Sequence, residues 1–358
     1  MSRVPLPELP NRVPDAASER RLRQIREEAA QRGTVSGTGI VPISAPFPKA
    51  TAETGYYGIP MLKEPQWKPE VPVYFFVGGA AGAAAVIASA ANLLTDDDRL
   101  VRSARLVAAA GGIISPALLV SDLGVPSRFL NMLRVFKLQS TMNVGAWTLA
   151  AFSSFAGAAA FANLARERVA DVLPVRIVER MSGFMAAVTG TVLSTYTGVL
   201  IGATAIPVWN DHIYSLPHHF AASGVNSAVS ILELMGHDNR ALNLLGTAAS
   251  AFEVYEGVEI EVRRDRVNEP LHKGLSGTIV RAGGIMSGPI PLALRVASLV
   301  SGKKELRRVA CWSSLIGSIL TRFGWVRAGH ASARDHRIPL CLPEEAPEVR
   351  KSSQELAA

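Results

Sequence analysis

Long apolar runs alternate with short charged gaps from residue 71 to about residue 326. A helix needs about 20 apolar residues to cross the hydrocarbon core of a bilayer, and the first run has that length. The pattern predicts an all-α fold, a polytopic transmembrane helical bundle of about eight spans. Seven spans is the alternative, because the second and eighth runs are short or interrupted by polar residues. The expected spans are 71–94, 104–122, 142–164, 183–208, 214–235, 241–260, 274–299 and 308–326.

Polar segments flank this region at both ends of the chain. Residues 1–55 are rich in Pro, Arg, Glu, Ser and Gly and have too little apolar surface to offset the entropy of ordering. We expect a disordered tail there, with a short charged helix near 18–31; a docking arm for a partner is the alternative. Residues 56–330 form the expected transmembrane domain, and residues 331–358 form a polar C-terminal tail.

Small residues crowd the apolar runs, as in Gly78-Gly79-Ala80-Ala81-Gly82. Lipid tails are as apolar as the helices, so helices in a membrane associate through close backbone approach at such residues. These segments are therefore expected to pack helix against helix.

The formal charge of +7 does not indicate a nucleic-acid surface. Lys and Arg lie mainly in short loops beside apolar runs, as they do in inserted proteins. With eight spans both tails share one face, and the loops of the opposite face carry more Lys and Arg. This distribution places the tails outside the cytoplasm.

Polar groups at the start of the first run, the end of the second and the start of the third are expected on one membrane face, because consecutive spans alternate in direction. Asp122 ends the second run and Arg128 follows it. Ionisable groups at membrane depth usually face a partner or a cavity. Asp122 could form an ion pair with Arg128 that fixes a turn, or could exchange a proton with a ligand entering between helices.

Aromatic side chains are expected at the same face, namely Tyr56, Tyr57, Trp67, Tyr74, Trp147 and Trp209. They could form an interfacial belt. They could also line an apolar cleft for a flat ring bearing carbonyl groups. Asn143 and His212 lie at a similar depth and could add hydrogen bonds.

Three charged residues are expected within the sixth and seventh spans. Glu253 and Glu256 are one helical turn apart on one face, and Arg281 is expected at the same depth on the neighbouring span. Because an uncompensated charge there costs several kcal/mol, we expect pairing. The group is either a structural ion pair or a proton relay.

No motif for a resident redox cofactor is visible. Haem would need histidines at matching depth on facing helices, but only His218 and His219 fall within an expected span, and they are adjacent. Two cysteines, Cys311 and Cys341, are too few for an iron–sulfur or zinc site. We therefore expect no haem, iron–sulfur cluster or metal bound by this chain.

Five segments resemble a known family, the NrfD/PsrC membrane subunits of polysulfide-reductase-like complexes. The segments are Tyr56-Tyr57-Gly58-Ile59-Pro60, the entry from Trp67 to Gly82, Asp122-Leu123-Gly124-x-Pro126-x-Arg128-Phe129, Ser140-x-Met142-Asn143-Val144-Gly145-x-Trp147 and Thr195-Tyr196-Thr197-Gly198-Val199-Leu200. The resemblance extends from about Tyr56 to Arg337. One position departs from it, because Val125 stands where the family usually has a basic residue.

The resemblance implies a subunit without its own cofactor that binds quinone or quinol near the non-cytoplasmic face of the bacterial cytoplasmic membrane. It implies electron exchange with a ferredoxin-like iron–sulfur subunit, connected to a molybdopterin or multihaem catalytic subunit. By motif, Asp122 and Arg128 would belong to the quinone pocket, with Asn143 and Trp147 beside them. The depth of the residues in their spans adds Tyr74 and Trp209 to this expected site and His212 to Asp122 as a group that exchanges protons.

Two other functions remain as alternatives. One is an ion- or proton-translocating subunit whose route includes Glu233, Glu253, Glu256 and Arg281; broken helices near Pro289 and Pro291 would favour it. The other is a passive anchor that holds a soluble enzyme at the membrane.

Overall fold

The fold is taken from a computed structural model, which describes residues 20–21, 23–24, 27–28, 62–123, 125–169, 171–335 and 337–339. Residues described between 20 and 28 are helical, within the range where a short charged helix was expected. The remaining parts of both expected tails, with Tyr56, Tyr57 and Cys341, lie outside the described residues. A compact unit begins at Leu62.

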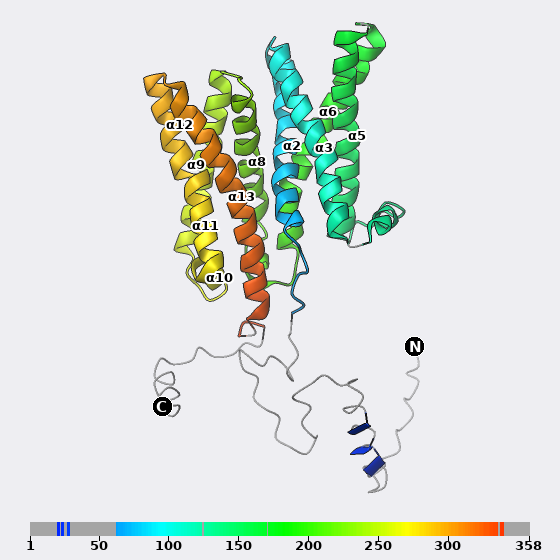
Figure 1. Cartoon of the computed structure of the whole chain (residues 1–358), viewed down its shortest axis with the longest axis vertical. Helices are drawn as coiled ribbons and strands as arrows, with labels where there is room; N and C mark the ends of the chain where they lie inside the picture. The colour runs from blue at the N-terminus through cyan, green and yellow to red at the C-terminus, as the bar shows by residue number, and fades with distance from the viewer. Residues whose placement is uncertain are drawn as a thin grey trace, which may run out of the picture. The chain divides into compact units, whose positions relative to one another are not determined.

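Long helices lie side by side in this unit (Figure 1). The described residues contain no strand. Four short helical segments lie between the long ones: η1 (Pro126–Arg128), α4 (Phe129–Met132), α7 (Pro207–Asp211) and α10 (Glu269–His272). The long helices are α2 (Glu70–Leu94), α3 (Asp98–Asp122), α5 (Thr141–Arg168), α6 (Leu173–Gly202), α8 (Ser215–Leu234), α9 (Arg240–Val262), α11 (Gly274–Ser287), α12 (Pro289–Ser301) and α13 (Lys304–Arg334).

Six segments of the described chain are long and apolar enough to cross a membrane, counting α11 and α12 together as one. The all-helical membrane fold is thereby confirmed, but the count of about eight spans is not. The two long helices outside this set are α8 and α9, which carry many of the buried polar side chains. Helix α8 packs against α13, and α9 packs against α8 and α12.

Helix α2 packs against both α6 and α8 through glycines. A Cβ atom added at Gly82 would lie 2.3 Å from the carbonyl oxygen of Gly190 in α6. A Cβ added at Gly224 in α8 would lie 2.8 Å from the carbonyl oxygen of Gly79. Backbones can approach this closely only where both helices have glycine, which is the packing that the small residues predicted.

Two helices differ from the expected spans. Helix α6 begins at Leu173 rather than near residue 183 and ends at Gly202, so Trp209 lies on the separate helix α7. The expected span 274–299 is divided at Gly288 into α11 and α12. Pro289 and Pro291 cause this break, because proline lacks the N–H that continues a helical hydrogen-bond ladder.

Candidate functional site

Asp122 connects the end of α3 to the segment that leads into α2. Its Oδ1 accepts a hydrogen bond from the backbone N–H of Lys68 at 3.2 Å. Arg128 lies exposed in η1, and no ion pair joins it to Asp122 among the described residues. Asp122 therefore meets the segment that precedes α2, and the Asp122–Arg128 ion pair, one of the two alternatives, is absent among the described residues.

Asn143 holds the loop between α4 and α5 in place. Its Nδ2 donates to the carbonyl oxygens of Met132 at 2.6 Å and Val135 at 3.0 Å. Its Oδ1 accepts from the backbone N–H of Lys137 at 2.7 Å. Both amide hydrogens are thus used inside the protein, which leaves Asn143 one spare acceptor lone pair for a ligand.

Tyr74 lies between the first four long helices and is buried. A Cβ added at the neighbouring Gly78 would contact both the Tyr74 ring, at 3.4 Å, and the Ser115 Oγ of α3, at 3.6 Å. Ser115 Oγ and Thr197 Oγ1 have no hydrogen-bond partner among the described residues, although both are buried. Ser115 lies beside Tyr74 and Gly78, about two turns in from the start of α2.

Trp147 and Trp209 have different neighbours and different solvent exposure. Trp147 on α5 is 38% exposed and packs edge to face on Phe136, with ring centroids 6.1 Å apart. Trp209 on α7 is fully buried, stacks on Trp67 at 5.1 Å, and donates from Nε1 to the carbonyl oxygen of Trp325 at 2.8 Å. The structure therefore does not place these two tryptophans in one cluster, because α7 packs against α13.

His212 lies with Trp209 beside α13. Its Nε2 donates to Asn268 Oδ1 at 2.8 Å, and its Nδ1 lies 3.1 Å from Ser215 Oγ. Asn268 Nδ2 in turn donates to Asp211 Oδ2 at 3.0 Å. Burial lowers the pKa of His212, which favours the neutral ring in this arrangement.

The expected grouping of Glu253 and Glu256 with Arg281 is wrong. Arg281 instead binds Glu261, with Nη2 2.8 Å from Oε1 and Nε 3.1 Å from Oε2. The register between α9 and α11 explains this, because Glu261 lies two turns beyond Glu253, about 12 Å along the helix axis. Glu253 and Glu256 stay buried, and Glu253 accepts a hydrogen bond from Asn226 of α8 at 3.2 Å.

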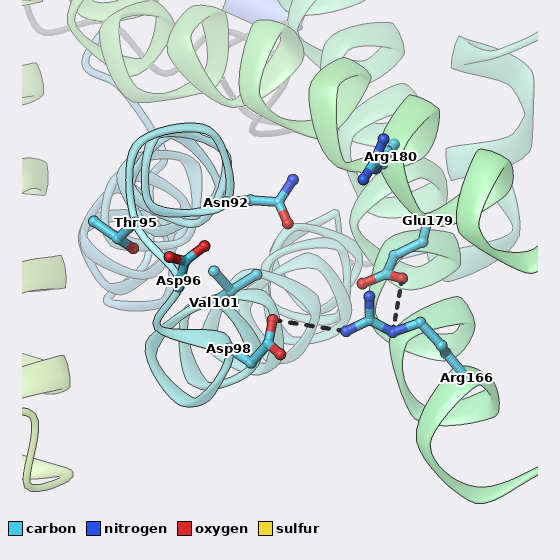
Figure 2. Close-up of a pocket in the computed structure, with 8 residues that line it drawn as sticks. All are labelled: Asn92, Thr95, Asp96, Asp98, Val101, Arg166, Glu179 and Arg180. Atoms are coloured by element: carbon cyan, nitrogen blue, oxygen red, sulfur yellow. Dashed lines mark ion pairs between the residues drawn. The ribbon is translucent and has the colours of Figure 1, made fainter. Parts of the chain in front are cut away.

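A buried ion cluster between α3, α5 and α6 was missed in the sequence. Glu179 accepts hydrogen bonds from Arg105 and from Asn163 Nδ2, the latter at 2.9 Å, and lies 3.3 Å from Arg166 Nε. Figure 2 shows this acid beside a polar cavity of about 200 Å³ that Arg180 and Asp98 also line. The sequence did contain a sign that Glu179 belongs to a helix, because apolar residues at helical spacing precede it from residue 173.

Two further buried arginines, Arg295 and Arg322, were also missed. Each is a single charge in an otherwise apolar run, which is the usual mark of a functional or paired group in a membrane helix. Arg295 Nη1 lies 2.7 Å from Glu233 Oε2. Arg322 lies over the Phe220 ring at 3.7 Å and donates to the Phe220 carbonyl oxygen at 3.0 Å.

A protein-family model matches the chain, over the part of the bundle that runs from before α2 to just after α8. The family model described as polysulphide reductase, NrfD, matches residues 61–237. This range includes Asp122, Asn143 and His212 and ends just after α8, so Glu253 and Arg281 lie beyond it. No curated protein matches the chain.

Proposed function

Since this chain belongs to the NrfD family through residues 61–237, we propose that it is the quinone-reactive membrane subunit of a polysulfide-reductase-like complex. The apolar helices and the family together make it a multi-pass membrane protein. In the proposed complex the chain binds quinone or quinol and exchanges electrons with an iron–sulfur subunit. That subunit connects it to a molybdopterin or multihaem enzyme in the bacterial cytoplasmic membrane, and both tails face away from the cytoplasm.

The proposed ligand site lies between α2, α3, α5 and α6, at the end where α3 finishes. Two buried hydroxyls, that of Ser115 beside Gly78 and that of Thr197 on α6, carry this proposal. Ser115 and Thr197 have hydroxyl groups without partners among the described residues, and Tyr74 lies beside Ser115. A buried hydroxyl without a partner is costly. A quinone carbonyl would satisfy such a donor.

Asp122 is the proposed proton-exchanging group at the mouth of this site. It is partly buried and accepts one hydrogen bond from the described residues, from the Lys68 N–H, so one carboxylate oxygen remains to accept a proton. His212 serves a second proton exit, because its hydrogen bonds lead through Asn268 to the exposed Asp211. Arg128 supplies positive charge near the same end.

Replacing Asp122 with Asn tests the proposal. In the complex isolated through a tag on this chain, Asp122→Asn is expected to lower quinol turnover about a hundredfold, the usual contribution of a positioned proton acceptor. The matched control is Asp171→Asn, because Asp171 is exposed and pairs with Arg176 between α5 and α6. Quinol oxidation is followed by its ultraviolet absorbance. Equal turnover in both variants would remove Asp122 from the mechanism.

A further inference from the structure

Helix α8 carries a row of polar side chains on one face. His219, Ser223, Asn226, Ser227, Ser230 and Glu233 follow each other at intervals of one, three or four residues. Side chains three and four apart share a helix face. Nearly all of this polar face of α8 is buried, and its side chains contact Glu253 of α9, Ser287 of α11, Arg295 of α12 and Ser318 of α13, so the face points into the bundle rather than toward lipid.

The polar face of α8 has the length of a membrane crossing. From Ser215, where α8 begins, to Glu233 the helix rises by eighteen steps of 1.5 Å, or about 27 Å. The hydrocarbon core of a bilayer is about 30 Å thick. Polar groups therefore continue through the whole depth that an apolar helix would need to cover.

One end of the polar face reaches solvent at Asp211. The side chain of Asp211 is 36% exposed. It accepts a hydrogen bond from Asn268, which accepts one from His212, and His212 Nδ1 lies 3.1 Å from Ser215 Oγ. This chain of contacts leads from the surface to the first turn of α8.

Serine hydroxyls and a carboxyl group continue the row at mid-depth. Ser318 of α13 lies 2.6 Å from Ser223 Oγ and 3.1 Å from Ser227 Oγ. Asn226 Nδ2 donates to Glu253 Oε1 at 3.2 Å and to the Ser287 carbonyl oxygen at 3.0 Å.

The break between α11 and α12 exposes that Ser287 carbonyl to the polar face. In an unbroken helix the oxygen of Ser287 would bind the N–H of residue 291, but Pro291 has none. Asn226 supplies the missing donor. Discontinuous helices with freed backbone groups at mid-membrane are typical of ion-conducting sites.

The other end reaches solvent at Asp238. Arg295 Nη2 donates to Ser230 Oγ at 3.1 Å, and its Nη1 lies 2.7 Å from Glu233 Oε2. Glu233 Oε1 lies 3.8 Å from Arg307, which forms an ion pair with Asp238. Asp238 is 43% exposed.

Several atoms along the polar face have no hydrogen-bond partner among the described residues. They include both ring nitrogens of His219, Oε2 of Glu253, Oδ1 of Asn226, and Nε and Nη1 of Arg322. If these side chains served only to join helices, each of these atoms would be expected to form a hydrogen bond with a side chain of a neighbouring helix. Buried polar atoms left open by the protein are normally bound to internal water.

We propose that the polar face of α8, together with Glu253 and the α11–α12 break, is a hydrated proton path between Asp211 and Asp238. Water, serine hydroxyls, His219 and the carboxyl groups of Glu253 and Glu233 carry the proton, each accepting it from one neighbour and releasing a proton to the next, so that no group is altered after a passage. Arg295 and Arg307 stay protonated and only hold Ser230, Glu233 and Asp238 in place. Water bridges the four-residue steps of about 6 Å along α8. Glu253 holds the transferred proton at mid-depth, where the freed Ser287 carbonyl and Asn226 orient the water.

The experiment measures proton flux through the full chain in sealed lipid vesicles. A potassium gradient with valinomycin imposes the membrane potential, and a trapped pH dye reports proton entry. Wild-type vesicles are expected to acidify faster than protein-free vesicles. Glu253→Gln removes the proton-carrying group and is expected to slow the flux about a hundredfold. Glu253→Asp keeps a carboxyl group and is expected to retain most of it.

The matched control is Glu261→Gln on the same helix, since Glu261 binds Arg281 at the exposed side of α9. It is expected to conduct as wild type does. Ser318→Ala provides a second disruption, because it breaks the Ser223–Ser227 connection with a smaller change in the core. Vesicles that stay as proton-tight as protein-free ones, or equal flux in Glu253→Gln and wild type, would overturn the proposal. The assay contains no quinone, so its result is independent of the quinone site.

Discussion

At the scale of single residues, the burial of an ion pair decides how much it contributes to the stability of the bundle. Glu179 is 3% exposed and its partner Arg105 is 5% exposed. Glu167 and Arg102 form a similar pair at 2.9 Å, but they are 31% and 44% exposed. Removing one member of a buried pair leaves an uncompensated charge, whereas an exposed pair contributes little.

Glu179→Gln is therefore expected to lower the free energy of unfolding by about 3–5 kcal/mol. The control Glu167→Gln is expected to lower it by about 1 kcal/mol or less. Both are measured by denaturant titration in detergent micelles. Equal losses in the two variants would show that the Glu179 charge does not balance Arg105.

His212 makes stability depend on pH. Burial lowers its pKa in the folded protein below the ordinary value of 6.5, so the unfolded chain binds more protons between the two pKa values. The stabilisation is complete above pH 6.5 and is lost as the pH falls toward the folded pKa. The thermal midpoint of the wild type is expected to fall over this range more steeply than that of His212→Gln. Parallel pH profiles would contradict the assignment.

At the scale of helices, glycine contacts fix the distance between α2 and its neighbours. Gly82 faces the Gly190 carbonyl oxygen so closely that a methyl group does not fit. Gly82→Ala is expected to cost about 1–3 kcal/mol of stability through overpacking. Gly157→Ala on α5 is the control, because nothing lies within 4 Å of the added atom. It is expected to stabilise by about 0.5–1 kcal/mol, since glycine is unfavourable inside a helix.

Unfolding of the two glycine variants in the same detergent measures this difference. If Gly82→Ala is as stable as Gly157→Ala, then α2 and α6 can separate without cost, and the glycine contact does not set their packing.

The positions of the helices could be predicted from the sequence because apolar run length is a local property. The register between helices could not, because it depends on contacts far apart in the chain. Arg281 illustrates this limit: its depth was inferred from distances to the ends of spans, yet it pairs with Glu261. Glu179 illustrates another, since its charge suggested a loop, while inside α6 Arg105 balances that charge and Asn163 donates a hydrogen bond to the carboxylate.

At the candidate site, the sequence predicted the meeting of Asp122 with the start of α2 but not the separation of Trp147 from Trp209. The first contact follows from alternating span direction. The separation follows from α7, a five-residue helix that carries Trp209 toward α13 and has no signature in the apolar pattern.

At the scale of the whole molecule, the number of crossings depends on α8 and α9. These helices contain 20 and 23 residues, enough to span a bilayer, but their buried polar side chains lower their mean hydropathy. Such side chains face the bundle rather than lipid, so they do not prevent insertion. We therefore predict that α8 and α9 cross the membrane as a hairpin and that the bundle has eight crossings.

The number of membrane crossings can be tested with single-cysteine variants, which are labelled on intact cells with a membrane-impermeant thiol reagent. With Cys311 and Cys341 replaced by Ser, Met235→Cys in the α8–α9 turn is expected to label from the same side as Asp171→Cys. Ser127→Cys after α3 and Arg264→Cys after α9 are expected to label from the opposite side, which is the outside if the tails face away from the cytoplasm. Labelling of Met235→Cys together with Ser127→Cys would mean that α8 and α9 do not cross. The bundle would then have six crossings, and the polar face of α8 could not connect the two sides of the membrane.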